Sequence, residues 1–358
     1  MTGHCRNCLL PAAVPEAKLD SAGVCACCRN APLIDLDLQE QQRKNRDADL
    51  EEALKACRGQ GMYDCMVTLS GGKDSVYLLH RIKRDYNLNV LAYTVNVNLT
   101  EIAWKNIHRT VELLDVPHII YTPPKDVYRK LFRFLLGNQE ARGAVHTVCY
   151  VCAPLTEGYA LQLAVEKHIP LILAGYSPGQ PDPDRMVYEF SPKMIGETDW
   201  TPAEVRDSGL FDAAELGLFW NPGRFPAGTP FPRFLAPFHA WKYSQADNMK
   251  LVVQLGLIAN SRHANPVFSN CPVNWLLMYS DLKNLGYNPY APEFSALIRQ
   301  RKASRWYWAI MGPTVNFMIR RQILLGRNVR KSFQWLGLKP EDLKITRPAA
   351  ISTLNVDS

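Results

Sequence analysis

The sequence predicts an α/β fold in which helices sandwich a parallel sheet, with a small cysteine-rich module before it and a mostly helical region after it. Two observations predict the sheet. Short apolar runs alternate with longer stretches of helical periodicity, and a glycine pair separates the first run from the first helical stretch. The predicted strands span residues 62–69, 90–96, 118–121 and 170–175, and the predicted helices span residues 76–86, 101–114, 127–136 and 155–168.

The glycine pair lies in the string Ser70-Gly71-Gly72-Lys73-Asp74-Ser75. Adjacent glycines let consecutive backbone N–H groups converge on an anion, and a following helix directs the positive end of its dipole at the same point. The spacing differs from that of a Walker A loop and from that of a dinucleotide-binding Gly-x-Gly-x-x-Gly turn. The string therefore predicts a phosphate-binding loop of another class. The alternative is an ordinary Gly-Gly turn that is capped by Asp74 or Ser75.

The string resembles the PP-loop, SGGxDS, of the ATP pyrophosphatases, which have a Rossmann-like α/β/α fold and adenylate a carbonyl oxygen while releasing pyrophosphate from ATP. This resemblance implies that ATP and Mg²⁺ bind at Ser70, Gly71, Gly72, Lys73, Asp74 and Ser75. It also implies that Val95 borders the adenosine and that Gly175 closes over the phosphates. Lys73 is then expected to stabilise charge on the phosphates, and Asp74 to hold the metal or cap the helix.

The first cysteine group consists of two Cys-x-x-Cys pairs near the start of the chain, Cys5 with Cys8 and Cys25 with Cys28. Four thiolates at this spacing are typical of a closed, structural zinc site, and Cys27 is the spare cysteine. A short polar segment offers little core in which reduced cysteines could be buried instead. We therefore expect zinc to fold this segment without taking part in catalysis.

The second cysteine group consists of Cys149, Cys152 and the distant Cys271. We expect the first two just before the helix at 155–168, where a helix amino end would lower the thiol pKa at the ATP edge of the sheet. Their order and spacing resemble those of PP-loop tRNA sulfurtransferases, in which three cysteines hold a [4Fe-4S] cluster and leave one iron free for sulfide. The resemblance implies thiolation of a carbonyl in a tRNA base or small molecule. A merely structural role for the three cysteines is the alternative.

A second resemblance covers residues 5 to 175 and leads to a different nucleophile. The paired cysteines, the string Asp20 to Cys25, the string Tyr63-Asp64-Cys65 and the string Ile169 to Ile172 are similar to those of N-acetyl sugar amidotransferases of surface-polysaccharide synthesis. Those enzymes replace the activated oxygen with ammonia from a separate glutaminase subunit. In that case, Cys149, Cys152 and Cys271 form a structural clip or a wall of the substrate site.

The carboxy-terminal region is strongly basic. Residues 294–340 contain ten Lys or Arg residues and no Asp or Glu, whereas the whole chain has a net charge of +7. Interleaved aromatic residues, among them Trp306 and Phe317, suit phosphate contacts with stacking on unpaired bases. An anionic membrane or a nucleotide-linked sugar would also be attracted. The alternative is a solvated pair of basic helices whose aromatic residues pack on the core.

We expect six segments in the chain. They are a zinc knuckle at 1–35, a linker helix at 36–60, the ATP-binding core at 61–175, a proline- and aromatic-rich insertion or lid at 176–240, a basic helical region at 241–345 and a tail at 346–358. The chain has ten cysteines and no secretory segment, and its longest apolar stretch, Trp306 to Ile319, is shorter than the ~20 residues of a membrane span.

These features predict a cytoplasmic enzyme without a transmembrane segment, and they are compatible with a homodimer. Thiolation with a sulfur donor and amidation with a glutaminase partner share one adenylation mechanism. A non-enzymatic nucleotide sensor with a retained PP-loop is the third interpretation.

Overall fold

The computed structural model describes residues 3–30, 36–177, 188–265, 271–301 and 303–349. In this part of the chain a six-stranded sheet has the order β3-β2-β1-β5-β7-β6, in which only the edge strand β6 is antiparallel. The strands are β1 (Cys65–Thr68), β2 (Val90–Val95), β3 (His118–Tyr121), β5 (Leu171–Leu173), β6 (Glu189–Phe190) and β7 (Arg233–Leu235). The predicted parallel α/β fold is therefore confirmed.

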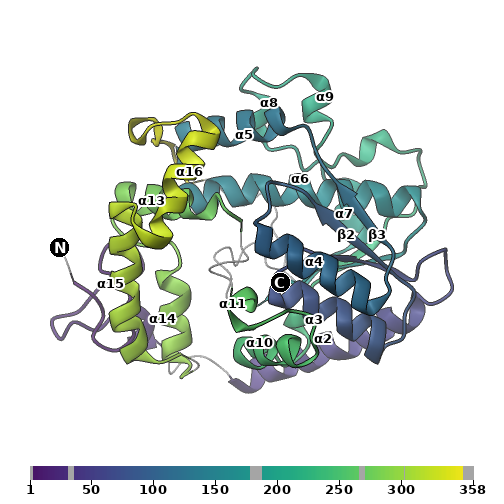
Figure 1. Ribbon diagram of the computed structural model, residues 1–358, viewed down its shortest axis with the longest axis horizontal. Coiled ribbons are helices and arrows are strands. Elements are labelled where there is room, and N and C mark those ends of the chain that lie inside the picture. Colours follow the sequence, from purple (N-terminus) through teal and green to yellow (C-terminus); the bar gives the residue numbers. More distant parts are fainter. Residues whose placement is uncertain (1–2, 31–35, 178–187, 266–270, 302, 350–358) are drawn as a thin grey trace.

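Helices cover both faces of this sheet (Figure 1). Alternate residues of β1 point to opposite faces, so Val67 packs against one group of helices whereas Met66 packs against another. The first face is covered by α2 (Leu36–Ala56), α3 (Lys73–His80), α4 (Glu101–Leu114) and α10 (Gln245–Gln254). The second face is covered by the carboxy-terminal half of α6 (Ala144–Glu166) and by segments between β6 and β7.

A separate helical region packs around its own core. Its helices are α5 (Lys125–Gly137), the amino-terminal half of α6, α13 (Asn274–Asn284), α14 (Ala291–Arg299), α15 (Arg305–Arg321) and α16 (Arg327–Leu336). The shared core includes Leu131, Val148, Leu276, Ile319 and Phe333. A short parallel pair, β4 (Gln139–Glu140) with β8 (Ile345–Arg347), joins the late chain to this region. The prediction of a mostly helical carboxy-terminal region is confirmed, although β8 falls partly within the predicted tail.

The predicted core boundary at Gly175 is too early, because the sheet continues with β6 and β7 from the predicted insertion at 176–240. Buried aromatic side chains such as Trp200 and Trp220 hold this segment on the sheet. It also contains α7 (Pro192–Glu197), α8 (Ala203–Arg206), α9 (Ala213–Leu216) and a 3-10 turn at Pro222–Arg224. Residues 178–187 of the predicted lid lie outside the described residues.

The helix that carries Cys149 and Cys152 begins earlier than predicted, at Ala144 instead of residue 155. Its start is capped from another element, because the Asp281 carboxylate of α13 accepts hydrogen bonds from the backbone N–H groups of Ala144 and Val145. Among the described residues α6 is also the one helix long and apolar enough to cross a membrane, and 56% of its apolar window is buried inside the fold. Packing in this core accounts for its apolar composition.

Candidate functional site

The glycine string forms the turn between β1 and α3, at the carboxyl edge of the sheet. The Ser75 hydroxyl accepts a hydrogen bond from the Ser70 N–H at 3.2 Å and donates one to the Gly72 carbonyl at 3.1 Å, which folds the turn back on itself. Gly71 has a φ of +78°, and a Cβ at this position would overlap the carbonyl oxygen of Ala103 in α4. Gly72 is the N-cap of α3, and glycine has no side chain that could accept a hydrogen bond from the first N–H groups of the helix. The first N–H groups of α3 therefore have no side-chain cap, as a phosphate site at a helix start requires.

Lys73 and Asp74 form a buried pair at this helix start. The Lys73 Nζ lies 2.6 Å from Asp74 Oδ2, and the Lys73 side chain is only 6% exposed. Asp74 Oδ1 accepts hydrogen bonds from the Tyr243 hydroxyl at 3.1 Å and from Asn248 Nδ2 of α10 at 3.4 Å. Asp74 lies in the first turn of α3, where its negative charge also suits the helix dipole. These contacts orient the carboxylate and, through it, the lysine ammonium.

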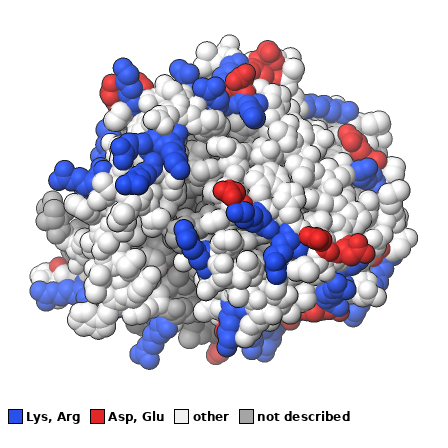
Figure 2. Space-filling model, in the orientation of Figure 1, with Lys and Arg blue, Asp and Glu red and all other residues white. Residues whose placement is uncertain are grey.

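The turn opens into a cleft of about 2150 Å³ between the sheet and the helical region. Figure 2 shows the surface recessed between these two parts of the molecule. Val95, at the end of β2, and Gly175, after β5, both line the cleft, and Gly175 lies directly against the backbone of Ser75. Pockets for small ligands usually enclose ~300–1000 Å³, so this cleft has room for ATP and a second substrate.

Cys149, Cys152 and Cys271 line the same cleft as the glycine turn. Cys149 and Cys152 lie within α6 and not before a helix, which corrects the prediction that a helix amino end lowers their pKa. Burial raises the pKa of the Cys152 thiol well above its usual range, and negative charge on Cys271 and Cys149 raises it further. Burial also raises the pKa of Cys271, and the backbone N–H groups of Val273 and Asn274 oppose part of that rise.

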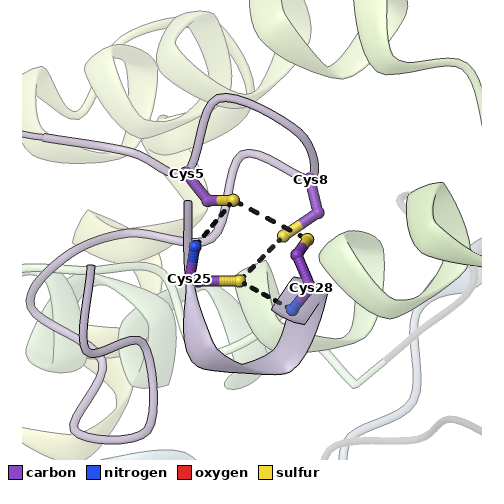
Figure 3. A group of neighbouring side chains, drawn as sticks. All are labelled: Cys5, Cys8, Cys25 and Cys28. Atoms are coloured by element: carbon purple, nitrogen blue, oxygen red, sulfur yellow. Dashed lines mark hydrogen bonds between the residues drawn. The ribbon is translucent and has the colours of Figure 1, made fainter. Parts of the chain in front are cut away.

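The four amino-terminal cysteines converge on one point (Figure 3). Their sulfur atoms all lie within 4.8 Å of one another, with 3.7 Å between Cys5 and Cys28 and 3.5 Å between Cys8 and Cys25. A tetrahedral ion with Zn–S bonds of ≈ 2.3 Å separates its sulfur ligands by about 3.8 Å, so the group fits a metal ion of this size. Among the described residues, no other group of three or more His, Cys, Asp or Glu side chains brings its ligand atoms together closely enough to hold a metal ion.

The thiols of this cysteine group differ in pKa: burial raises the pKa of Cys25 to about 11 and that of Cys28 well above its usual range, whereas the pKa of Cys5 is lowered. Although burial opposes ionisation of Cys5, backbone N–H groups of Cys25, Cys8 and Asn7 outweigh it and lower the pKa of the thiol to about 6. In addition, Arg299 Nη1 of α14 lies 3.4 Å from the Cys8 sulfur. Cationic and N–H donors around ligand sulfurs stabilise the negative charge of a metal–thiolate site.

Several residues of the site carry no recognisable signal in the sequence. Tyr243 and Asn248 reach Asp74 from a part of the chain about 170 residues away. Glu293 of α14 also lines the cleft; burial raises the pKa of its carboxyl to about 7, and the Lys73 ammonium opposes part of that rise. Its one visible signal is that it is the last acid before the basic run at 294–340.

No protein-family model matches the chain. A probable sulfurtransferase from Methanocaldococcus jannaschii is 35% identical over 112 residues, which are 28% of this chain and 32% of that protein. The match thus spans about a third of the relative's length.

Three solved structures align with most of this chain at low similarity. The U34-tRNA thiolase NcsA from Methanococcus maripaludis with its [4Fe-4S] cluster has a TM-score of 0.36 and 13% identity, with 95% of this chain and 90% of that chain covered. The NH3-dependent NAD synthetase from Campylobacter jejuni has a TM-score of 0.36 and 14% identity, with 86% and 98% covered. The NMN synthetase from Francisella tularensis has a TM-score of 0.35 and 9% identity, with 86% and 97% covered.

The glycine turn between β1 and α3 lies at the carboxyl edge of a mostly parallel sheet with helices on both faces, which is the arrangement that the resemblance of the loop to PP-loop proteins implies.

Proposed function

We propose that the protein uses ATP to replace a carbonyl oxygen of its substrate with sulfur. The observation that carries this proposal is that Cys149, Cys152 and Cys271 line the same cleft as the phosphate turn. The probable sulfurtransferase from Methanocaldococcus jannaschii, which matches part of the chain, supports it. A nucleobase of tRNA and a small molecule both carry a suitable carbonyl, and the cleft has room for either beside ATP.

The reaction has two steps. The substrate oxygen attacks the α-phosphorus of ATP, the bond to the β-phosphate oxygen breaks, and pyrophosphate leaves. A sulfur nucleophile then attacks the adenylated carbon, the carbon–oxygen bond breaks, and AMP leaves with the oxygen. The backbone N–H groups of Gly72 and Lys73 and the Lys73 ammonium would stabilise the negative charge that develops on the phosphates. Asp74, held by Tyr243 and Asn248, would keep that ammonium in place.

Cys149, Cys152 and Cys271 would hold a [4Fe-4S] cluster, since Cys149 and Cys271 both lie within electrostatic range of Cys152. Their sulfurs are not all within the 4.8 Å spacing of the amino-terminal group, but a cluster holds its cysteines farther apart because irons and sulfides stand between them. Burial opposes charge on Cys152 and Cys271, and bound iron would offset that penalty. Three protein ligands would leave one iron of such a cluster open to sulfide.

Iron analysis of anaerobically reconstituted protein tests the cluster. We expect about four iron and four sulfide per chain in the natural protein and loss of both in Cys149→Ala, Cys152→Ala and Cys271→Ala. The matched control is Cys57→Ala, because Cys57 is a buried cysteine of the main core outside both groups. It should retain the iron.

The nucleophile is tested by AMP release with either sulfide or ammonia. Sulfide should stimulate release in the reconstituted protein and not in Cys149→Ala. Iron-free protein that turns over with ammonia or a glutaminase would instead establish amidation, which uses the same phosphate turn. Lys73→Ala should abolish pyrophosphate release under either nucleophile, since both reactions begin with adenylation.

A further inference from the structure

The outward face of α15 is apolar and exposed. Trp306, Ile310 and Phe317 are 75%, 67% and 55% exposed, and their spacing places them on one side of the helix together with Pro313. The opposite side faces the protein, where Trp308 stacks on Phe294 of α14 at 3.6 Å between ring centroids. The helix therefore has one anchored side and one apolar side in solvent.

The apolar surface continues past the end of α15. Ile323 and Leu324 are 40% and 65% exposed, and Tyr307 flanks the stripe at 55%. Six of the thirteen large hydrophobic side chains that are exposed in the described part of the chain lie within these nineteen positions, 306–324. Scattered exposed apolar residues need no explanation, whereas a concentration of this kind marks an interaction surface.

The stretch of chain that forms this surface carries cations and no acid. Within residues 294–340 all ten charged residues are Lys or Arg. The Arg305 guanidinium lies 5.6 Å from the Trp306 ring centroid, and the Arg321 guanidinium lies 5.9 Å from that of Phe317, so positive charge stands at both ends of the stripe. Figure 2 shows further Lys and Arg side chains gathered over α16, next to α15.

We propose that α15 docks the protein on an anionic lipid surface. An apolar stripe of Trp, Phe and aliphatic side chains with arginines at both ends matches the boundary between acyl chains and negatively charged headgroups. RNA offers no partner for Ile310, Ile323 or Leu324, because its recognition relies on phosphates and on stacking. A second copy of the chain would bring two such stretches together, each with ten Lys or Arg residues and no acid, and like charges repel.

Docking through this face would place the lipid surface beside the cleft. Trp306 and Ile310 do not line the cleft, whereas Pro313 and Phe317 of the same stripe do. The amino-terminal part of the stripe would thus contact lipid alone, and its carboxy-terminal part would lie at the border between lipid and cleft. This inference concerns where the protein works and does not depend on which nucleophile it uses.

Vesicle co-sedimentation of the full chain tests the proposal. We expect at least about tenfold more binding to phosphatidylcholine vesicles that contain roughly one quarter phosphatidylglycerol than to phosphatidylcholine alone. Salt at about 0.5 M should reduce that binding, since screening weakens contacts with headgroups. The double variant Trp306→Ser with Ile310→Ser should lose the binding and keep the melting temperature and the ATP affinity.

The matched control is Met62→Ser with Leu210→Ser, two apolar side chains that are 72% and 55% exposed elsewhere. This control should bind anionic vesicles as the natural protein does. Three outcomes would overturn the proposal: equal binding to neutral and anionic vesicles, tRNA binding that the α15 double variant abolishes while vesicles do not bind, or a dimer in light scattering that the same double variant dissociates.

Discussion

Glu293 brings a titratable carboxyl into the cleft that holds the phosphate turn. Burial raises its pKa to about 7, and it lies within electrostatic range of Lys73. The charge of Glu293 also acts on the phenols of Tyr243 and Tyr290. Burial raises the pKa values of both phenols, so they stay neutral near neutral pH. Of Glu293, Tyr243 and Tyr290, only Glu293 therefore changes its charge near neutral pH. Below its pKa it is neutral, and above it a carboxylate opposes the arrival of ATP phosphates.

ATP affinity should consequently fall several-fold as the pH rises from about 6 to about 8. Glu293→Gln should bind ATP as the natural protein does at low pH and should show a flatter pH profile, because its amide never ionises. Calorimetric titration with Mg-ATP at fixed ionic strength measures this difference, and the protonation of ATP itself is common to both proteins. Glu341→Gln, an exposed glutamate outside the cleft, is the control. Parallel profiles for the natural protein and Glu293→Gln would refute the assignment.

At the scale of elements, the turn between β1 and α3 depends on close packing against α4. Gly71→Ala places a Cβ against the Ala103 carbonyl in a backbone conformation that costs an L-residue roughly 1–2 kcal/mol. Gly209→Ala is the matched control, because Gly209 has a similar φ of +67° and open space around it. Both variants should lose thermal stability. Only Gly71→Ala should also lose ATP affinity, by more than about tenfold. Equal ATP affinity in the two variants would show that the turn tolerates displacement.

Sequence periodicity predicts the helices and strands whose own residues alternate between apolar and polar with a regular period. The helix at 101–114 and the strand at 118–121 have the predicted bounds. The first half of α6 was not predicted, because β-branched residues and Pro154 disfavour a helix there and a cap from Asp281, over 130 residues away, begins it. The strand β7 was missed because its three residues, which lie between Pro232 and Pro237, are too few to show a period.

The residues of the candidate site likewise divide into those that a local sequence motif reveals and those that only tertiary packing brings to the site. The phosphate turn and the four amino-terminal cysteines are contiguous motifs and could be found from spacing alone. Tyr243, Asn248 and Glu293 could not, because only tertiary packing brings them to Asp74 and Lys73. The pKa of Cys152 was predicted in the wrong direction because burial, which the sequence does not show, outweighs the helix dipole in the interior of α6.

At the scale of the whole molecule, the amino-terminal cysteine group packs against the helical region at residues 287–305. Tyr287 and Ile298 pack against it, and Arg305 Nε donates a hydrogen bond to the Arg6 carbonyl at 2.9 Å. Leu9 and Pro11 of the same module line the cleft. A metal at this site would therefore stabilise the cleft wall that faces α14 and α15, in addition to the module itself.

Removal of that metal should weaken the cleft wall while the phosphate turn stays formed. We expect about one zinc per chain in the natural protein and none in Cys25→Ala, since four thiolates complete a structural site. Cys25→Ala should melt several degrees lower and lose most turnover, but it should bind ATP within about twofold of the natural protein, because β1 and α3 form the turn without the module. Cys27→Ala is the control, since Cys27 lies in the same helix α1 (Ala26–Asn30) outside the ligand group. Elemental analysis, thermal unfolding and ATP titration measure the three effects. Zinc loss from Cys27→Ala, or a Cys25→Ala protein with natural stability and turnover, would contradict a metal-braced cleft.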